Sequence, residues 1–188
     1  MVPIFIESDL HTVHPATTET EREMRSYLFL EENGVPYTRV SHDEAATIEL
    51  CKEVEQVLGA DICKNLLLCN RQQTDFYLLL MPGDLPFKTK LLSSQIGSAR
   101  LSFASGEQMW DLLGVKPGSL TVLALLNDPD KRVRLLVETH LLQAEWFACH
   151  PCVNTATVKF RTADLFDKLL PALGRDYTPV QLEEPLED

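Results

Sequence analysis

The sequence has few basic residues. Among its 188 residues, 17 Lys and Arg stand against 28 Asp and Glu, which gives a formal net charge of −11. A protein that coats nucleic acid needs many Lys and Arg contacts with phosphates, so this balance argues against that class. The apolar share of 45% and the charged share of 24% are ordinary for a globular protein, which excludes wholesale disorder. A local basic pocket remains compatible with the composition.

Long hydrophobic runs and an export signal are also lacking. The longest apolar runs, such as residues 76–81, are far shorter than the about 20 residues that a membrane-spanning helix requires. The N-terminus has no basic region, and Pro3 and Glu7 interrupt its apolar stretch, which predicts no signal peptide. The five cysteines are irregularly spaced, and without an export signal they favour reduced thiols in a cytoplasmic protein. We expect no membrane partner.

Several common catalytic motifs are absent. The sequence has no Gly-x-Ser-x-Gly elbow, no Walker loop, no Gly-x-Gly-x-x-Gly and no His-Glu-x-x-His. It therefore gives no signal for a serine hydrolase, a nucleotidase, a dinucleotide-binding enzyme or a zinc protease of those types.

Hydrophobic periodicity predicts one α/β domain. Helical spacing predicts helices over residues 17–32, 47–58, 88–96, 105–113 and 163–173. Apolar runs predict strands at 37–40, 65–69, 76–81, 121–126, 133–138, 145–148 and 156–160. Two of the turns predict hairpins, and hence a mixed, largely antiparallel sheet flanked by helices. We expect the domain to cover residues 1–174, with an irregular segment at 1–16 and an acidic, flexible tail at 175–188.

Two short segments could carry chemistry. Lys64 is the first residue of a predicted strand and lies on the same face as Leu66 and Leu68. It is either a functional cation or a side chain whose ammonium group extends to solvent at the strand end. The segment 114–118 holds two glycines and a proline. It is either a plain helix-to-strand connection or a turn that aims backbone N–H groups at an anion or oxyanion.

A third segment, residues 149–157, contains a Cys-x-x-Cys pair and has three interpretations. A redox motif would need a helix after Cys149, whereas the β-branched residues that follow Cys152 favour a strand. A zinc site would need a second ligand pair, which the other cysteines do not form. The third interpretation is a polar loop that presents His150 and Asn154 to a substrate.

Five segments taken together, in this order, carry a resemblance to a known family. They are residues 64–68, 100–103, 110–118, 124–128 and 150–157. The stretch from about residue 24 to 173 resembles the YbaK-type domains, also called prolyl-tRNA-synthetase-associated editing domains, and among them the free-standing ProXp-ala or PrdX-like branch. One position departs from the pattern: this chain has Val122 where many relatives have proline.

The resemblance implies a hydrolase that removes alanine mischarged onto proline tRNA. Because the sequence shows no metal-ligand spacing, we expect neither a metal nor another cofactor. Lys64 would grip the 3′-terminal nucleotide or its phosphate, Gly118 would lie in the loop around the reacting carbonyl, and His150 would shape the pocket or act as base. The ribose hydroxyl of the substrate would help to activate water. Further substrate-binding residues under this hypothesis are Asn65, Gly114, Pro117, Ser119, Asn154 and Thr155.

The expected partner is mischarged tRNA(Pro), chiefly through its 3′ end, with prolyl-tRNA synthetase as a second partner to consider and a monomer or weak homodimer as the oligomeric state. A local basic rim for the RNA would come from Lys88, Lys90, Arg100 and Lys116. Three alternatives stay open: a deacylase for Cys, Ser or Thr; a non-catalytic protein that binds a small ligand or tRNA; and a redox protein that uses Cys149 and Cys152.

Overall fold

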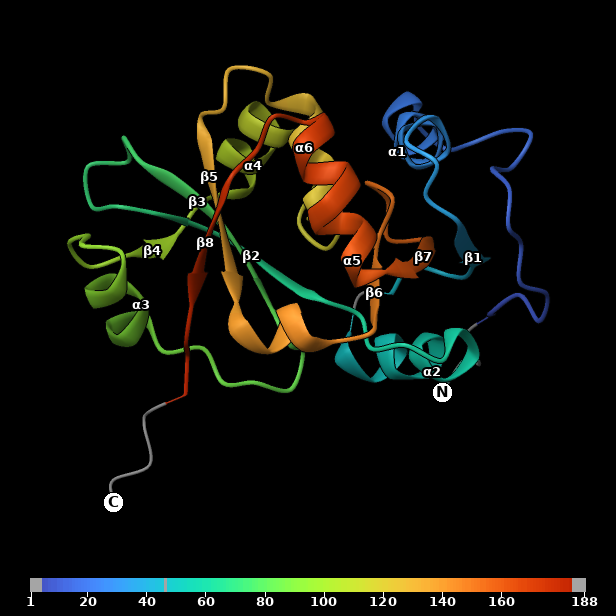
Figure 1. Cartoon of the computed structure of the whole chain (residues 1–188), viewed down its shortest axis with the longest axis horizontal. Coiled ribbons are helices and arrows are strands. Elements are labelled where there is room, and N and C mark those ends of the chain that lie inside the picture. The colour runs from blue at the N-terminus through green and yellow to red at the C-terminus, as the bar shows by residue number, and fades with distance from the viewer. Residues whose placement is uncertain (1–4, 46, 184–188) are drawn as a thin grey trace.

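Two β-sheets with helices around them form the computed structural model, which describes residues 5–45 and 47–183 (Figure 1). The three-stranded sheet is antiparallel with order β1-β7-β6, and the five-stranded sheet is mixed with order β4-β2-β3-β5-β8. The strands are β1 (Tyr37–Ser41), β2 (Lys64–Cys69), β3 (Phe76–Met81), β4 (Ser102–Phe103), β5 (Val133–Glu138), β6 (Trp146–Cys149), β7 (Ala156–Arg161) and β8 (Tyr177–Val180). The predicted α/β class is confirmed, with the strands divided between two sheets.

Several of the helices begin at a residue whose side chain caps them. They are α1 (Glu21–Glu32), α2 (Ile48–Leu58), α3 (Thr89–Gln95), α4 (Gly106–Leu113), the 3₁₀-helices η1 (Val122–Asn127) and η2 (Thr139–Gln143), and a last helix built from α5 (Thr162–Asp164), the π-helical turn η3 (Leu165–Leu169) and α6 (Leu170–Ala172). The Ser105 hydroxyl accepts from the Gln108 N–H and the Gln108 side chain accepts from the Ser105 N–H, which is the predicted capping box. Gly114 ends the same helix with a left-handed φ of 63°.

One predicted strand is wrong. Residues 121–126 were expected to pair with β5 in a hairpin, but Val122–Asn127 form η1. The Thr121 hydroxyl accepts from the Leu123 N–H and so caps a helical turn, and a short apolar run cannot by itself distinguish a strand from a buried helix. As a result β5 pairs in parallel with β3. Val122 is the first residue of η1, a position where proline also fits.

The expected flexible tail is also wrong for residues 175–183. Tyr177–Val180 form β8, which pairs in parallel with β5 at the edge of the sheet, where Pro179 is tolerated. The Arg175 guanidinium is buried and donates to the Asp128 carboxylate at 3.0 Å. Val180 and Leu182 are buried against the sheet. The remaining tail residues, 184–188, lie outside the described part of the chain.

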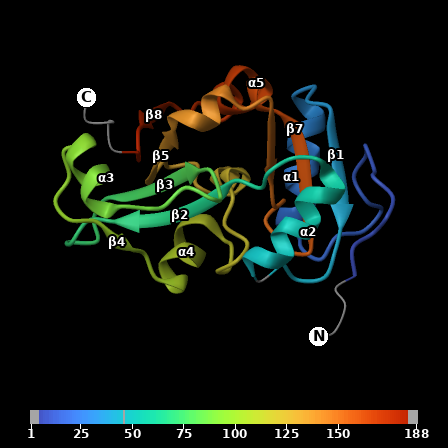
Figure 2. The same ribbon diagram turned by 90° about the horizontal axis from the view of Figure 1, so that it is seen from below.

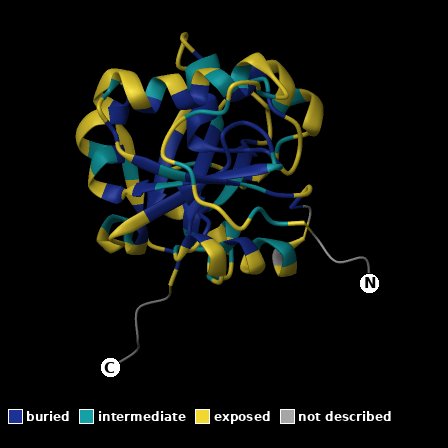
Figure 3. Ribbon diagram, turned by 90° about the vertical axis from the view of Figure 1, so that its right-hand side faces the viewer, coloured by how far each residue is buried: buried dark blue, intermediate teal, exposed yellow. Residues whose placement is uncertain are grey.

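The main hydrophobic core includes side chains from both sheets, among them Leu78 and Leu135 of the five-stranded sheet and Phe147 and Phe160 of the three-stranded sheet. In Figure 3 the buried residues gather in the middle of the molecule, and the exposed residues lie on the outer helices and loops. Figure 2 shows α3 and the three-stranded sheet at opposite ends of the molecule. No helix within residues 5–45 and 47–183 is long and apolar enough to cross a membrane.

Candidate active site

Lys64 and His150 follow the point where the two sheets meet. Ile62 and Ala148 form a parallel bridge, and the Cys63 N–H donates to the Ala148 carbonyl at 2.9 Å. Lys64 and His150 each lie two positions beyond this bridge, Lys64 at the start of β2 in one sheet and His150 just after β6 in the other. Lys64 is half-buried, and its ammonium has no hydrogen-bond or ion-pair partner in the described part of the chain. It is therefore available to bind an anion.

His150 is buried and neutral. Its Nδ1 atom lies 3.0 Å from the Ala156 carbonyl oxygen and 3.2 Å from the Thr157 hydroxyl. Because a carbonyl only accepts, the proton is assigned to Nδ1 and the lone pair to Nε2. Burial, with a further contribution from the nearby His42, lowers the pKa of His150 to about 4. The side chain can thus accept a hydrogen bond at Nε2, and it is a weak base at neutral pH.

A tight turn brings Gly118 next to Asn154. The Ser119 N–H donates to the Lys116 carbonyl at 3.0 Å, and Pro117 and Gly118 occupy the two middle positions of the turn. Gly118 has a φ of 91°, which is the conformation that favours glycine at the third position of a type II turn. A Cβ atom on Gly118 would lie 3.4 Å from the Asn154 side-chain nitrogen, so these two predicted residues are neighbours.

The same turn determines which of its backbone N–H groups can bind a substrate oxygen. The Ser119 N–H closes the turn and is not available to a substrate oxygen. The Gly118 N–H has no hydrogen-bond partner among the described residues. Of the Gly118 and Ser119 N–H groups, the Gly118 N–H is therefore the one that can contact an oxyanion.

Asn65 and Thr155 differ in how their polar atoms are used. The Asn65 side-chain nitrogen donates to the Cys63 carbonyl at 2.9 Å, whereas its Oδ1 atom is buried without a hydrogen-bond partner in the described structure. The Thr155 hydroxyl donates to the Glu19 carboxylate at 2.5 Å. Asn65 thus keeps an unused acceptor, and Thr155 connects the 150–155 loop to the segment before α1.

Gly114 and Pro117 shape the loop between α4 and η1. Gly114 is the left-handed end of α4, and Pro117 packs on Gly106, where an added Cβ atom would lie only 3.1 Å from the proline ring. The loop is therefore held against the start of the helix that precedes it.

The buried cysteines argue against the redox alternative. Burial raises the pKa of the Cys149 thiol to about 12 and that of Cys152 to about 11. Both thiols are therefore protonated at neutral pH, whereas redox cysteines work as thiolates with a lowered pKa. Cys152 instead accepts a hydrogen bond from the Ser26 hydroxyl at 3.4 Å. In the described part of the chain, no three His, Cys, Asp or Glu side chains are grouped so that they could hold a metal ion.

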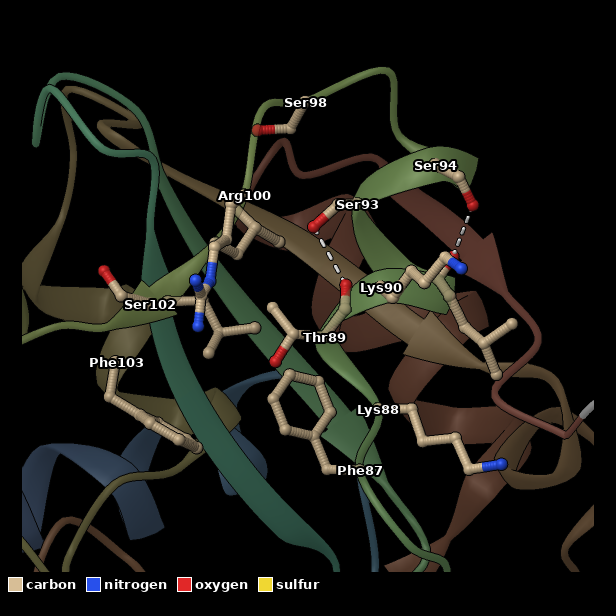
Figure 4. Close-up of a pocket in the computed structure, with 13 residues that line it drawn as sticks. Phe87, Lys88, Thr89, Lys90, Ser93, Ser94, Ser98, Arg100, Ser102 and Phe103 are labelled. Carbon is tan, nitrogen blue, oxygen red and sulfur yellow. Dashed lines mark hydrogen bonds between the residues drawn. The ribbon is translucent and has the colours of Figure 1, made fainter.

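A second surface, which we call the basic groove, lies between α3 and β4 (Figure 4). It has a volume of about 1200 Å³ and is lined by Leu68, Phe87, Lys88, Thr89, Lys90, Leu91, Ser93, Ser94, Ser98, Arg100, Leu101, Ser102 and Phe103. No acidic residue is among them, although the whole chain carries a charge of −11. Three of the four residues of the predicted basic rim lie here, while Lys116 and the nine predicted site residues do not.

Two aromatic rings add to the basic groove. The Phe87 and Phe103 rings meet edge to face with centroids 5.8 Å apart, and Phe103 is 64% exposed. Exposed aromatic rings next to cations are typical of surfaces that bind single-stranded nucleic acid. This pattern is not visible in the sequence, because the two rings are brought together by the fold.

An unpaired lysine and a free backbone N–H suit a substrate that carries both a phosphate and a reacting carbonyl, and the basic groove suits RNA. These features suit an enzyme that hydrolyses an ester linked to RNA. Residues 42–168 match the family described as the aminoacyl-tRNA editing domain. The chain belongs to this family, and it is an enzyme of the aminoacyl-tRNA deacylase class, as the sequence led us to expect.

Named relatives agree with this assignment. The chain is 31% identical over 153 residues to the prolyl-tRNA editing protein ProX of Acetoanaerobium sticklandii, which covers 81% of this chain and 93% of that protein. It is 29% identical over 139 residues to the prolyl-tRNA synthetase associated domain-containing protein 1 of Danio rerio, covering 73% of this chain and 75% of that one.

Solved structures share the fold. One of them, described as a candidate trans-editing enzyme for prolyl tRNA synthetase, superposes with a TM-score of 0.64 at 18% identity. The superposition covers 87% of this chain and 99% of the other. At this level of identity the likeness concerns the fold alone.

Proposed function

We propose that this protein is a trans-editing deacylase that hydrolyses the ester of Ala-tRNA(Pro). The observation that carries the proposal is the unpaired Lys64 ammonium at the junction of the two sheets, in a chain of the editing family. The names of its relatives, which refer to prolyl-tRNA, favour tRNA(Pro) as the RNA. The enzyme would act in the cytoplasm on mischarged tRNA that a synthetase has released.

The reaction needs only modest catalysis, because an aminoacyl ester is already activated. Lys64 would bind the terminal nucleotide through its phosphate, and the Gly118 N–H would stabilise the oxyanion, a contact worth about 100- to 1,000-fold in rate. Water would attack the carbonyl carbon, the ester C–O bond would break, and the ribose oxygen would leave with a proton. The neighbouring ribose hydroxyl and the neutral His150 would orient that water. No protein nucleophile is required.

Discrimination would follow from size. A synthetase pocket built for proline rejects the smaller alanine weakly, because each missing methylene changes binding by only about 1–3 kcal/mol. A second pocket that admits alanine and excludes proline removes the error. The pocket proposed here is therefore small.

The basic groove would guide the RNA to Lys64. Leu68 lines the groove, and Lys64 lies on the same face of β2, four residues away. At about 3.3 Å per residue this separation is about 13 Å, which a single-stranded 3′ end can span. Lys90 and Arg100 would contact phosphates, and Phe103 would offer a stacking surface. A protein this acidic would thus bind tRNA through few contacts and in a salt-sensitive manner.

The test is a deacylation panel with tRNA(Pro) charged with Ala, Pro, Cys, Ser or Thr. Hydrolysis of Ala-tRNA(Pro) alone supports the proposal, and EDTA is expected to leave the rate unchanged. Preference for Cys, Ser or Thr would assign a related deacylase instead. Binding of all five without hydrolysis would identify a non-catalytic tRNA-binding protein.

A further inference from the structure

A pair of side chains beside the 114–118 loop has no role in the reaction described above. The Arg22 guanidinium of α1 stacks on the Trp110 ring of α4, with its central carbon 4.9 Å from the ring centroid. The same guanidinium packs on Gly114, where an added Cβ atom would overlap it. Trp110 and Gly114 are one helical turn apart. The pair therefore lies where the candidate oxyanion loop begins.

Both members of the pair have unused binding capacity. Arg22 is half-buried, and its N–H donors have no hydrogen-bond or ion-pair partner within residues 5–45 and 47–183. Trp110 remains 50% exposed although the arginine covers part of it. The other Arg–Trp stack in the protein differs: Arg161 lies 4.5 Å from the Trp146 ring centroid, but it also donates to Glu145 at 2.7 Å.

We propose that Arg22 and Trp110 form a subsite for the 3′-terminal nucleotides of the RNA. The guanidinium donates to a phosphate through its free N–H groups, and a base stacks on the exposed part of the indole. Single-stranded RNA is commonly recognised in this way, by stacking on aromatic rings and by contacts with arginine. The inference rests on the proposed function, since RNA is the ligand that this function brings to the neighbouring loop.

Fluorescence tests the subsite directly, because the chain has two tryptophans. In Trp146→Phe, Trp110 is the only indole, and titration with the unacylated RNA tetranucleotide ACCA should quench its emission to saturation. Adding Arg22→Gln should weaken binding about tenfold and reduce the slope of log Kd against log salt by about 0.7, the contribution of one phosphate contact on a single strand. A purely structural Arg22 would leave that slope unchanged.

The second Arg–Trp stack supplies the controls. Trp110→Phe keeps Trp146 as the reporter, which should not respond to ACCA, and Arg161→Gln in the Trp146→Phe background should leave the Kd unchanged. The subsite is refuted if ACCA does not quench Trp110, or if Arg22→Gln changes neither Kd nor slope while its thermal midpoint shows a folded protein. Hydrolysis of Ala-tRNA(Pro) without quenching refutes the subsite alone; quenching without hydrolysis refutes the proposed function alone.

Discussion

Acid should destabilise the folded protein through His150. The folded state holds the pKa of His150 at about 4, because the ring is buried. In the unfolded chain it returns to about 6.5. Between these values the unfolded state binds more protons, so stability is complete above about pH 6.5 and falls as the pH falls toward 4. Linkage gives a loss of about 2 kcal/mol between pH 7 and pH 5.

The assay is urea unfolding at pH 7 and pH 5 for the native chain and for His150→Gln. Each chain loses unfolding free energy between pH 7 and pH 5. The difference between the two losses is the contribution of His150, because both chains share every other titrating group. His42, whose pKa burial also lowers, contributes in the same direction to both. We expect the native chain to lose about 2 kcal/mol more than the variant between the two pH values. Equal losses would refute the buried, neutral state of His150.

The remaining predictions concern Lys64 and Arg100, two of the cations of the proposed function. Lys64→Ala should abolish deacylation of Ala-tRNA(Pro). The thermal midpoint should stay nearly unchanged, because no hydrogen bond or ion pair joins this side chain to the described residues. Near-normal activity of the variant would show that Lys64 is not part of the site. Arg100→Gln should raise KM for tRNA and leave kcat unchanged. It should also reduce the slope of log KM against log salt concentration by about 0.7, the contribution of one phosphate contact. An unchanged KM and an unchanged slope would show that Arg100 of the basic groove does not bind the RNA.

Local signals made much of the fold predictable. Ser105 and Gln108 predict the start of α4, and Gly114 predicts its end, because helix caps depend on residues only a few positions apart. The segment 121–126 was misjudged because its apolar run suits a strand or a buried helix equally well, and the cap at Thr121 decides in favour of the helix. β8 was missed because its pairing with β5 and the burial of Arg175 are long-range.

The geometry of the candidate site was predictable in part. The turn around Gly118 follows from its Pro-Gly pair, and the resemblance to a family pointed to Lys64. Residue types alone could not show that the Ser119 N–H closes this turn or that burial suppresses the basicity of His150. Nor could they show the pair of Arg22 and Trp110, which comes from two different helices.

The most direct test of the central claim is the ratio of kcat/KM for Ala-tRNA(Pro) and Pro-tRNA(Pro), measured with the purified chain on the same tRNA. Exclusion of the larger residue predicts a preference for the alanine ester of about 100-fold or more, in the range that steric discrimination of a few methylenes can reach. Equal values for the two esters, or no hydrolysis of either, would contradict the assignment of this protein as an alanine-specific editing deacylase.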